Sequence, residues 1–171
     1  MGSELAEVLA KTAIREGEPL NIFRTLGHHP ALLKRFNVLG GAFIAQGLLP
    51  AREREIVILR VGWNCRAIYE FGQHTIMGRD AGLTDAEIAS LASTRALGDW
   101  SADDHALIAL ADELCADDCA SEATFAALRR RWNDAELIEL VMLAGFYRMV
   151  SGFLNTFGVQ PEAGLPGWPS A

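Results

Sequence analysis

The sequence predicts an all-α protein. Apolar side chains recur three and four residues apart along most of the chain, and no segment sustains the alternation of polar and apolar residues that is typical of a strand. Residues that begin or end helices stand between these periodic segments, as at Pro30, Gly82 and Thr84. Together these patterns favour a bundle of helices joined by short connections.

Most of the expected helices have a start or stop signal of their own. Pro30 suits a first helical turn, and Thr84 with Glu87 three residues later has the spacing of a capping box. Ser101 is a suitable N-cap before two aspartates, which favour the first turn of a helix. We expect helices over about 30–47, 51–63, 65–81, 84–92, 101–117, 121–132 and 133–158.

Length and composition describe one domain with two appendages. The chain has 171 residues, about the length of a single domain. We expect one domain over 1–171, with an N-terminal extension at about 1–18 and a Pro/Gly-rich arm at about 159–171. No run of about 18 apolar residues appears, so we expect no membrane span. Three cysteines without a framework spacing indicate a reduced, cytoplasmic protein.

Charge and hydropathy restrict the partners. The net charge of −7 argues against nucleic-acid binding, which needs a basic surface. It does not exclude a small anionic substrate, because a local pocket can oppose the overall charge. A mean hydropathy of +0.15 is high for a soluble monomer and indicates apolar surface that is covered between subunits. We therefore expect a small-molecule substrate and a homo-oligomer.

The segment "NCRAIYEFGQH", residues 64–74, places Glu70 and His74 one helical turn apart. Arg66 would lie a turn earlier on the same face, and Tyr69 adds a hydroxyl. Glu55 would approach this turn if the two helices pair antiparallel. A surface pair explains the same spacing. A metal site is less suited to it, because carboxylate-bridged bundles use Glu and His three apart. The third alternative is an acid–base site, in which neighbouring carboxyls and an imidazole separate their pKa values.

A longer pattern resembles the carboxymuconolactone decarboxylase family, which includes the alkylhydroperoxidase D-like proteins. The resemblance rests on the Glu-bearing "ILR" helix, then "YEFGQH" and "AGLTDAEI", and it extends over roughly residues 20–160. It implies an all-α, alkylhydroperoxidase D-like helical bundle. It also implies a homo-oligomer, with two, three or six subunits all compatible, and a pocket near the helix that carries the motif.

One departure from the family pattern affects the chemistry. The hydroperoxidase branch has a Cys-x-x-Cys pair, and its two positions correspond to Ala67 and Glu70 here. A peroxidatic cycle needs a thiolate and a resolving thiol, so we expect no robust thiol-dependent peroxide turnover. Cys65 stands two residues too early to substitute. Cys115 and Cys119, four apart on another expected helix, have the spacing of two small buried thiols.

The non-redox branch is more similar, and the reaction it implies is decarboxylation of a carboxymuconolactone without metal or cofactor. His74 would then protonate the enolate product, with Glu70 or Glu55 orienting or recharging it. Arg60 and Arg66 are the candidate cations for an anionic substrate, since arginine suits carboxylate recognition. Tyr69 and Asn155 are further candidates to line the pocket. Two alternatives remain at this point: a thiol peroxidase, and a non-catalytic oligomer that binds a ligand or partner.

Overall fold

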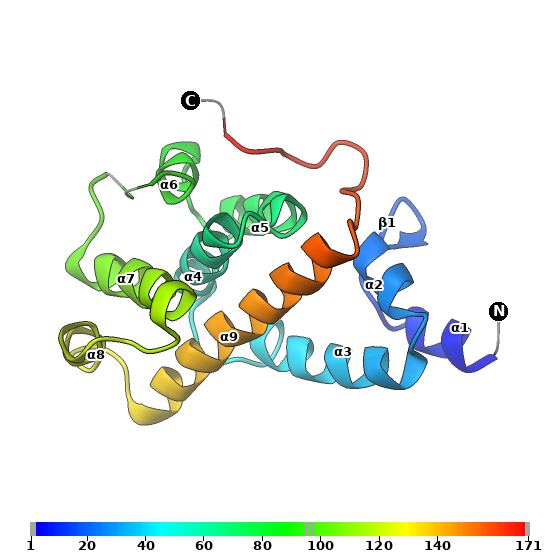
Figure 1. The fold of residues 1–171 in the computed structure, drawn as a ribbon, viewed down its shortest axis with the longest axis horizontal. Helices are drawn as coiled ribbons and strands as arrows, with labels where there is room; N and C mark the ends of the chain where they lie inside the picture. Colours follow the sequence, from blue (N-terminus) through cyan, green and yellow to red (C-terminus); the bar gives the residue numbers. More distant parts are fainter. Residues whose placement is uncertain (1–2, 95, 97, 170–171) are drawn as a thin grey trace.

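A computed structural model describes residues 3–94, 96 and 98–169, and its architecture confirms the all-α prediction (Figure 1). The expected helices from 30 onward are all present. The helices are α1 (Ser3–Leu9), α2 (Asn21–Leu26), α3 (Pro30–Ile44), α4 (Ala51–Asn64), α5 (Ile68–Asp80), α6 (Asp85–Leu91), α7 (Ala102–Asp117), α8 (Glu122–Leu128) and α9 (Asp134–Thr156).

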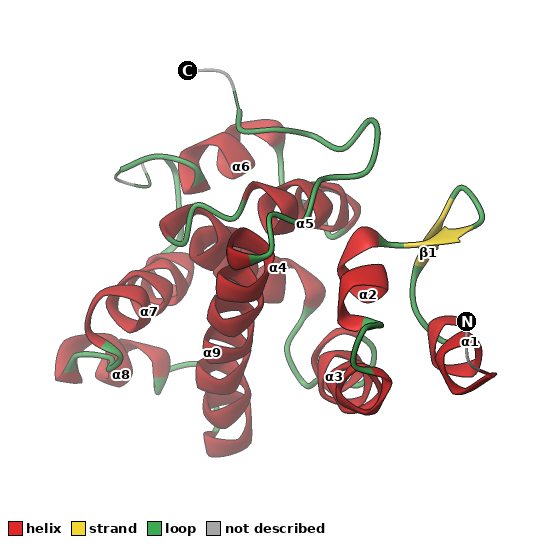
Figure 2. Ribbon diagram, turned by 45° about the vertical axis from the view of Figure 1, so that its right-hand side comes forward, coloured by secondary structure: helices red, strands yellow, loops and turns green. Residues whose placement is uncertain are grey.

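The N-terminal extension contains a helix and a small hairpin. Strands β1 (Ile14–Arg15) and β2 (Glu18–Pro19) pair antiparallel, with Ile14 opposite Pro19. The hairpin and α1 lie with α2 and α3 on one side of the molecule, and α4 to α9 form the other side (Figure 2). The extension is therefore folded against the domain, which the sequence did not indicate.

The capping signals operate as predicted, but some helix ends differ. Thr84, Ser101 and Asn133 each form a reciprocal capping box with the third residue of their helix. The helix expected over 65–81 begins only at Ile68. Arg66 has a left-handed backbone with φ 56°, which breaks the helical path between α4 and α5.

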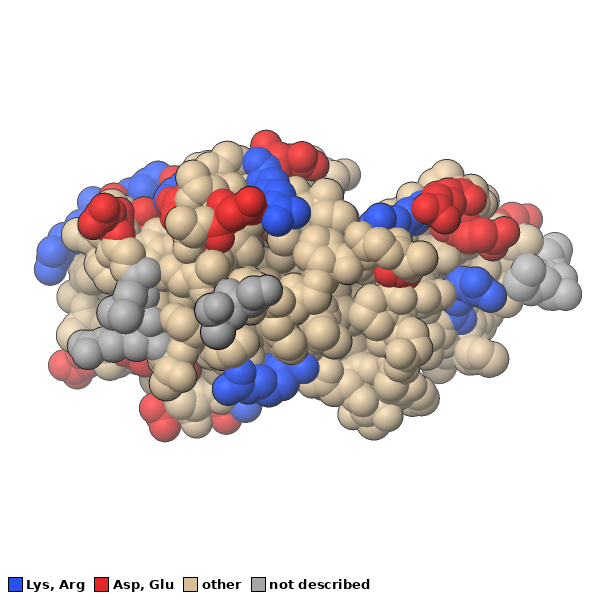
Figure 3. Space-filling view, turned by 90° about the horizontal axis from the view of Figure 1, so that it is seen from above, with Lys and Arg blue, Asp and Glu red and all other residues tan. Residues whose placement is uncertain are grey.

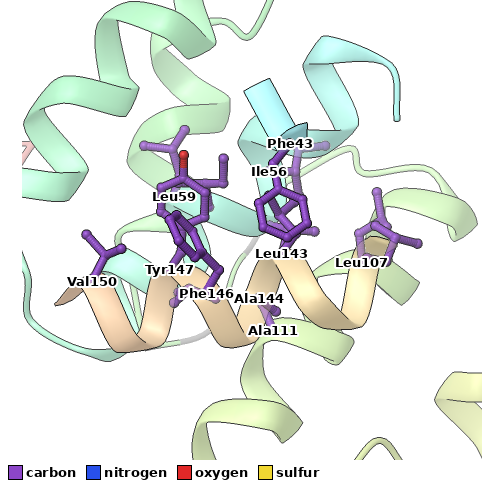
Figure 4. Close-up of a cluster of buried hydrophobic side chains, with 14 of the residues drawn as sticks. Phe43, Ile56, Leu59, Leu107, Ala111, Leu143, Ala144, Phe146, Tyr147 and Val150 are labelled. Atoms are coloured by element: carbon purple, nitrogen blue, oxygen red, sulfur yellow. The ribbon is translucent and has the colours of Figure 1, made fainter. Parts of the chain in front are cut away.

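Helix α4 lies at the centre and packs mainly on α5, α7 and α9. Every residue over 55–62 is buried, so this stretch is covered on all sides, as expected for a helix inside a core. Apolar side chains of α9 fill the space against α4 and α3, where Leu143, Phe146 and Tyr147 meet Phe43, Ile56 and Leu59 (Figure 4). This packing holds α4 rigidly in place.

Helix α9 is long and apolar enough to cross a bilayer, which the sequence analysis did not expect. It has 23 residues, and the mean hydropathy of its most apolar 18 residues is 1.6. Half of that stretch is buried within the protein. The helix also carries core residues such as Leu140 and Leu154. These contacts are those of the core helix of a bundle.

The C-terminal arm crosses its own chain and covers α5 (Figure 1). The Trp168 ring packs 5.2 Å from that of Trp63 and 5.0 Å from that of Phe71, measured between centroids. Glycine is required below it at position 72, because a Cβ there would lie 2.5 Å from the carbonyl oxygen of Pro166. The arm thus rests directly on the backbone of the helix that carries Glu70 and His74.

We expect Trp168→Ala to lower the free energy of unfolding by about 1–3 kcal/mol, because it removes apolar area that α4 and α5 bury. Urea denaturation followed by circular dichroism measures the change. Phe157→Ala is the matched control, since its ring is 66% exposed and should change stability by less than about 0.5 kcal/mol. Equal stability of the two variants would show that the arm adds nothing to the fold.

Candidate active site

Helices α4 and α5 run antiparallel, and this pairing forms the site. Contacts between them run in opposite order along the chain, since Gly62 lies against Phe71 while Leu59 lies against Gly78. The turn at 65–67 is short enough to reverse the chain directly. Glu55 and His74, 19 residues apart in sequence, therefore face each other inside the bundle.

His74 is held between two carboxyl groups. Its Nδ1 lies 2.6 Å from Glu55 Oε2, and its Nε2 lies 3.0 Å from Glu70 Oε1. All three side chains are buried. Glu55 is held in turn from behind, because Arg54 Nε donates to its Oε1 at 3.1 Å while the same guanidinium donates to the Ile44 carbonyl. The three sequence-predicted catalytic residues thus converge, and a surface Glu/His pair is ruled out.

These contacts decide the charge of the imidazole. Burial lowers the pKa of His74, but the negative charge of Glu55 and the hydrogen bonds to Glu55 and Glu70 outweigh it and raise the pKa to about 10. Burial raises the pKa of Glu55, and the charge of His74 with that of Arg54 more than offsets this, so the pKa is lowered overall. At neutral pH the pair is therefore an imidazolium beside a carboxylate.

The site opens onto a cavity of about 440 Å³ between α3, α5 and α9 and the N-terminal extension. Glu70 and His74 line its wall, whereas Glu55 is fully buried behind them. The Tyr147 ring meets the His74 ring edge to face at 4.9 Å. Burial, followed by the charges of Glu70 and Glu55, raises the pKa of Tyr147 well above its ordinary value, so its hydroxyl stays neutral.

Tyr69 also lines this cavity and joins α5 to the C-terminal arm. Its hydroxyl donates to Glu162 Oε1 at 2.7 Å and accepts from the Ile22 backbone N–H. Gln73 donates to the other oxygen of Glu162 at 2.7 Å. Burial and the hydrogen bond to Glu162 both raise the pKa of Tyr69. One carboxylate of the arm thus fixes two side chains on the cavity wall.

The other three candidate binding residues lie away from the cavity. Arg60 is buried against Asp112, with its Nε 2.5 Å from Oδ1. Arg66 stacks over the Trp63 ring at 4.2 Å, because its left-handed backbone removes it from the Glu70 face of α5. Asn155 donates to the carbonyl of Cys65 at 2.8 Å. The expectation that Arg60 or Arg66 supplies the pocket cation is therefore not met by their positions.

Sequence reasoning missed Lys11, Tyr147 and Glu162. Among the described residues that line the cavity, Lys11 is the one lysine or arginine. It lies in an extension without motif or periodic pattern, so no local signal pointed to it. Tyr147 sits on the core-facing side of α9 and is hidden within an apolar pattern. Among the described residues, no cluster of three His, Cys, Asp or Glu side chains suits a metal ion.

Comparison with known proteins agrees with this geometry. The sequence model of the carboxymuconolactone decarboxylase family matches residues 30–112, the segment that carries Glu55, Glu70 and His74. No curated protein matches the chain in sequence.

Similar solved structures share the fold. An uncharacterized peroxidase-related protein from Ralstonia eutropha JMP134, described as an alkylhydroperoxidase AhpD core, matches with a TM-score of 0.82 and 21% identity over 95% of this chain and 87% of that one. A peroxidase-related protein from Silicibacter sp. TM1040 gives 0.82 and 16% over 95% and 86%. The debrominase Bmp8, in complex with 2,3,4-tribromopyrrole, gives 0.73 and 15% over 94% and 82%.

The raised pKa of His74 predicts a specific dependence of stability on pH. In the unfolded chain the histidine titrates near 6.5, and in the folded protein near 10. Its contribution to stability is therefore complete below about pH 6.5 and is lost as the pH rises toward 10. The stability advantage of wild type over His74→Gln should shrink across this range by at least about 1.4 kcal/mol, the equivalent of one pH unit.

Urea unfolding of both proteins at pH 6.5, 8 and 9.5 measures this dependence. His105→Gln is the control, because His105 lies in the exposed first turn of α7 and outside the cavity. A constant difference between wild type and His74→Gln across the range would contradict a charged His74.

Proposed function

Because the chain belongs to the carboxymuconolactone decarboxylase family, we propose that it is a cofactor-free lyase or isomerase that acts on a small carboxylated or lactone-like substrate. The observation that carries this proposal is the row Glu55–His74–Glu70, which is buried at one end and reaches the cavity wall at the other. Such a row holds a proton beside a bound substrate and keeps bulk water away from it.

The row favours proton transfer in one direction. Glu55 is held by Arg54 and fully buried, so it orients the imidazole without touching substrate. His74 shares its Nε2 proton with Glu70, and both line the cavity. When a carboxylate leaves as CO2, the electron pair left on the substrate forms an enolate. A proton from the His74–Glu70 pair then completes the product, and solvent restores the proton.

The composition of the cavity wall supports a small substrate with one anionic group. Most of the wall is apolar, with side chains such as Phe23, Phe36 and Met77, which suit a compact carbon skeleton. Lys11 at the wall is the cation that offsets the carboxyl groups of the site and can pair with a substrate carboxylate. The overall negative charge does not prevent this, because attraction of the substrate depends on the local field.

A thiol peroxidase of the alkylhydroperoxidase type is less well supported. Ala67 and Glu70 occupy the two motif positions, and no cysteine is among the described residues that line the cavity. The similarity to peroxidase-related proteins and to a debrominase is below 25% identity and concerns the fold. The remaining alternative is a non-catalytic binding protein, and the activity experiment below separates it from an enzyme.

We also propose that the protein is a homo-oligomer. The outer face of α9 exposes Ile138, Met142 and Met149 at helical spacing, next to Val38 and Leu39 of α3. Apolar side chains gathered in this way are typical of a surface that another subunit covers. A second copy of this chain is the simplest occupant. On the face seen in Figure 3, acidic and basic groups are interspersed without a continuous basic patch.

In the activity experiment, lactones and β-keto acids are screened for decarboxylation or isomerisation, and active compounds are assayed with variants. We expect His74→Ala and Glu70→Gln each to lower kcat about a hundredfold or more, the scale of a positioned acid–base group. Both variants should fold, because Glu55 keeps Arg54 as its partner.

Arg66→Ala is the matched control for this experiment, since the side chain stacks on Trp63 outside the cavity and should leave kcat and KM unchanged. Circular dichroism and light scattering confirm that each variant is folded and assembled. Folded His74→Ala and Glu70→Gln proteins with wild-type turnover would show that the row is structural.

Light scattering at micromolar concentration tests assembly. We expect a mass that is a multiple of 18.6 kDa. Met142→Glu should dissociate the assembly, because it places a charge in the apolar face of α9. Ile14→Glu changes a residue of similar exposure on the distant β1 strand and should leave the mass unchanged. A stable wild-type monomer would refute the proposal.

A further inference from the structure

Two cysteines outside the cavity meet where α4 ends. Cys65 is the C-cap of α4, and Cys115 lies in the last turn of α7, the helix that packs closely on α4. Their thiols interact through a side-chain hydrogen bond, and both residues are partly buried. The expected approach of Cys115 to Cys119 does not occur, because α7 ends at Asp117 and Asp118 has a left-handed φ of 59° that turns Cys119 to the surface.

One face of α9 brings polar groups to both cysteines. Arg148, Ser151 and Asn155 follow each other at spacings of three and four, so they share a face. Arg148 donates to the carbonyl of Leu114, next to Cys115, at 2.9 Å. Asn155 donates to the carbonyl of Cys65. Ser151, between them, is fully buried, and among the described residues its hydroxyl has no oxygen or nitrogen partner and interacts with the Cys65 sulfur.

These contacts distinguish the two thiols. The hydrogen bond from Cys115 is the largest cause that lowers the pKa of Cys65; burial opposes it, and the charge of Arg148 and the Ser151 hydroxyl add to it, so that the pKa falls to about 7. The pKa of Cys115 is raised by the same hydrogen bond and by burial. A thiolate beside a thiol is the arrangement that reacts in thiol–disulfide exchange.

The other charged groups near the pair are already matched. Arg148 forms an ion pair with Asp118, and Asp112 accepts from both Arg60 and Asn64. The guanidinium of Arg66, the next residue along the chain, is directed onto Trp63. Arg148 is therefore the charge that favours the Cys65 thiolate.

Access differs between the two sulfurs. Cys115 lines a shallow hollow together with Met142 and Met149, so a second subunit on the outer face of α9 would cover it. Cys65 does not line that hollow and lies beside the exposed residue Arg66. An external reagent therefore meets Cys65 first, and Cys115 is placed to react second.

We propose that Cys65 and Cys115 form a reversible dithiol–disulfide site that exchanges with small disulfides such as oxidised glutathione. The Cys65 thiolate attacks one sulfur of the small disulfide, whose S–S bond breaks and releases one thiolate. Cys115 then loses its proton to solvent and attacks the Cys65 sulfur, which breaks the mixed disulfide and releases the second thiolate. The two protein thiols are oxidised, and one small disulfide is reduced to two thiols.

This site is independent of the proposed acid–base reaction, because neither cysteine is among the residues that line the cavity. It also does not predict peroxide turnover, since the step requires only exchange between a thiolate and a disulfide. The bond would join the end of α4 to α7 and close a loop that runs through α5 and α6.

The test is equilibration of the intact protein in buffers of defined reduced-to-oxidised glutathione ratio, followed by acid quench, alkylation and peptide mass spectrometry. We expect wild type and Cys119→Ser each to lose two thiols in one step and to give a peptide that links Cys65 with Cys115. Cys65→Ser and Cys115→Ser should give no internal bond. A wild type that keeps all its thiols, forms only mixed disulfides, or links Cys115 with Cys119 overturns the proposal.

A second measurement tests the geometry without relying on the bond. The rate of Cys65 alkylation by iodoacetamide, measured from pH 5 to 9, should rise with a midpoint near pH 7. Ser151→Ala and Arg148→Gln should both move this midpoint upward, because each removes a group that stabilises the thiolate. Arg129→Gln, on an exposed ion pair at the end of α8, is the control and should leave it unchanged. A midpoint that neither variant moves contradicts the assignment.

Discussion

The ion pair between Glu55 and His74 is the interaction on which the site depends. Two charges in the middle of a bundle are costly unless each is well paired, and here a 2.6 Å contact joins them. The pair can form only where α4 and α5 lie side by side and antiparallel. Arg54 completes the arrangement from one end and Glu70 from the other. The result is a row of four side chains in which only the last two reach the cavity.

The same logic applies to the other charges of α4. Arg52 pairs with Glu87 and Asp104, Glu53 with Arg131, and Arg60 with Asp112. Each of these pairs ties α4 to a different part of the chain, so the central helix is located by charge as well as by apolar packing. Arg60 consequently has a structural partner, which explains why it is not free to bind a substrate.

Both ends of the chain complete the cavity that the helices begin. The N-terminal extension contributes Lys11, and the C-terminal arm fixes Tyr69 and Gln73 through Glu162. The Glu162 carboxylate also accepts from the backbone N–H of Asn21 at the start of α2, at 2.6 Å. One side chain thus joins the arm, α5 and the N-terminal half. Variation in these terminal segments would change the substrate without disturbing the Glu55–His74–Glu70 row.

The sequence by itself determined the all-α class, the capping boxes at Thr84, Ser101 and Asn133, and the shared face of Glu70 and His74, because each depends on residues within about one helical turn. Glu55 was reached by adding one assumption, that adjacent helices pair antiparallel. Tertiary structure alone decided the rest. Arg66 leaves its expected face because of one backbone angle, Lys11 and Glu162 enter from distant segments, and Cys115 meets Cys65 instead of Cys119. These outcomes depend on how helices far apart in sequence pack, and no local pattern records that packing.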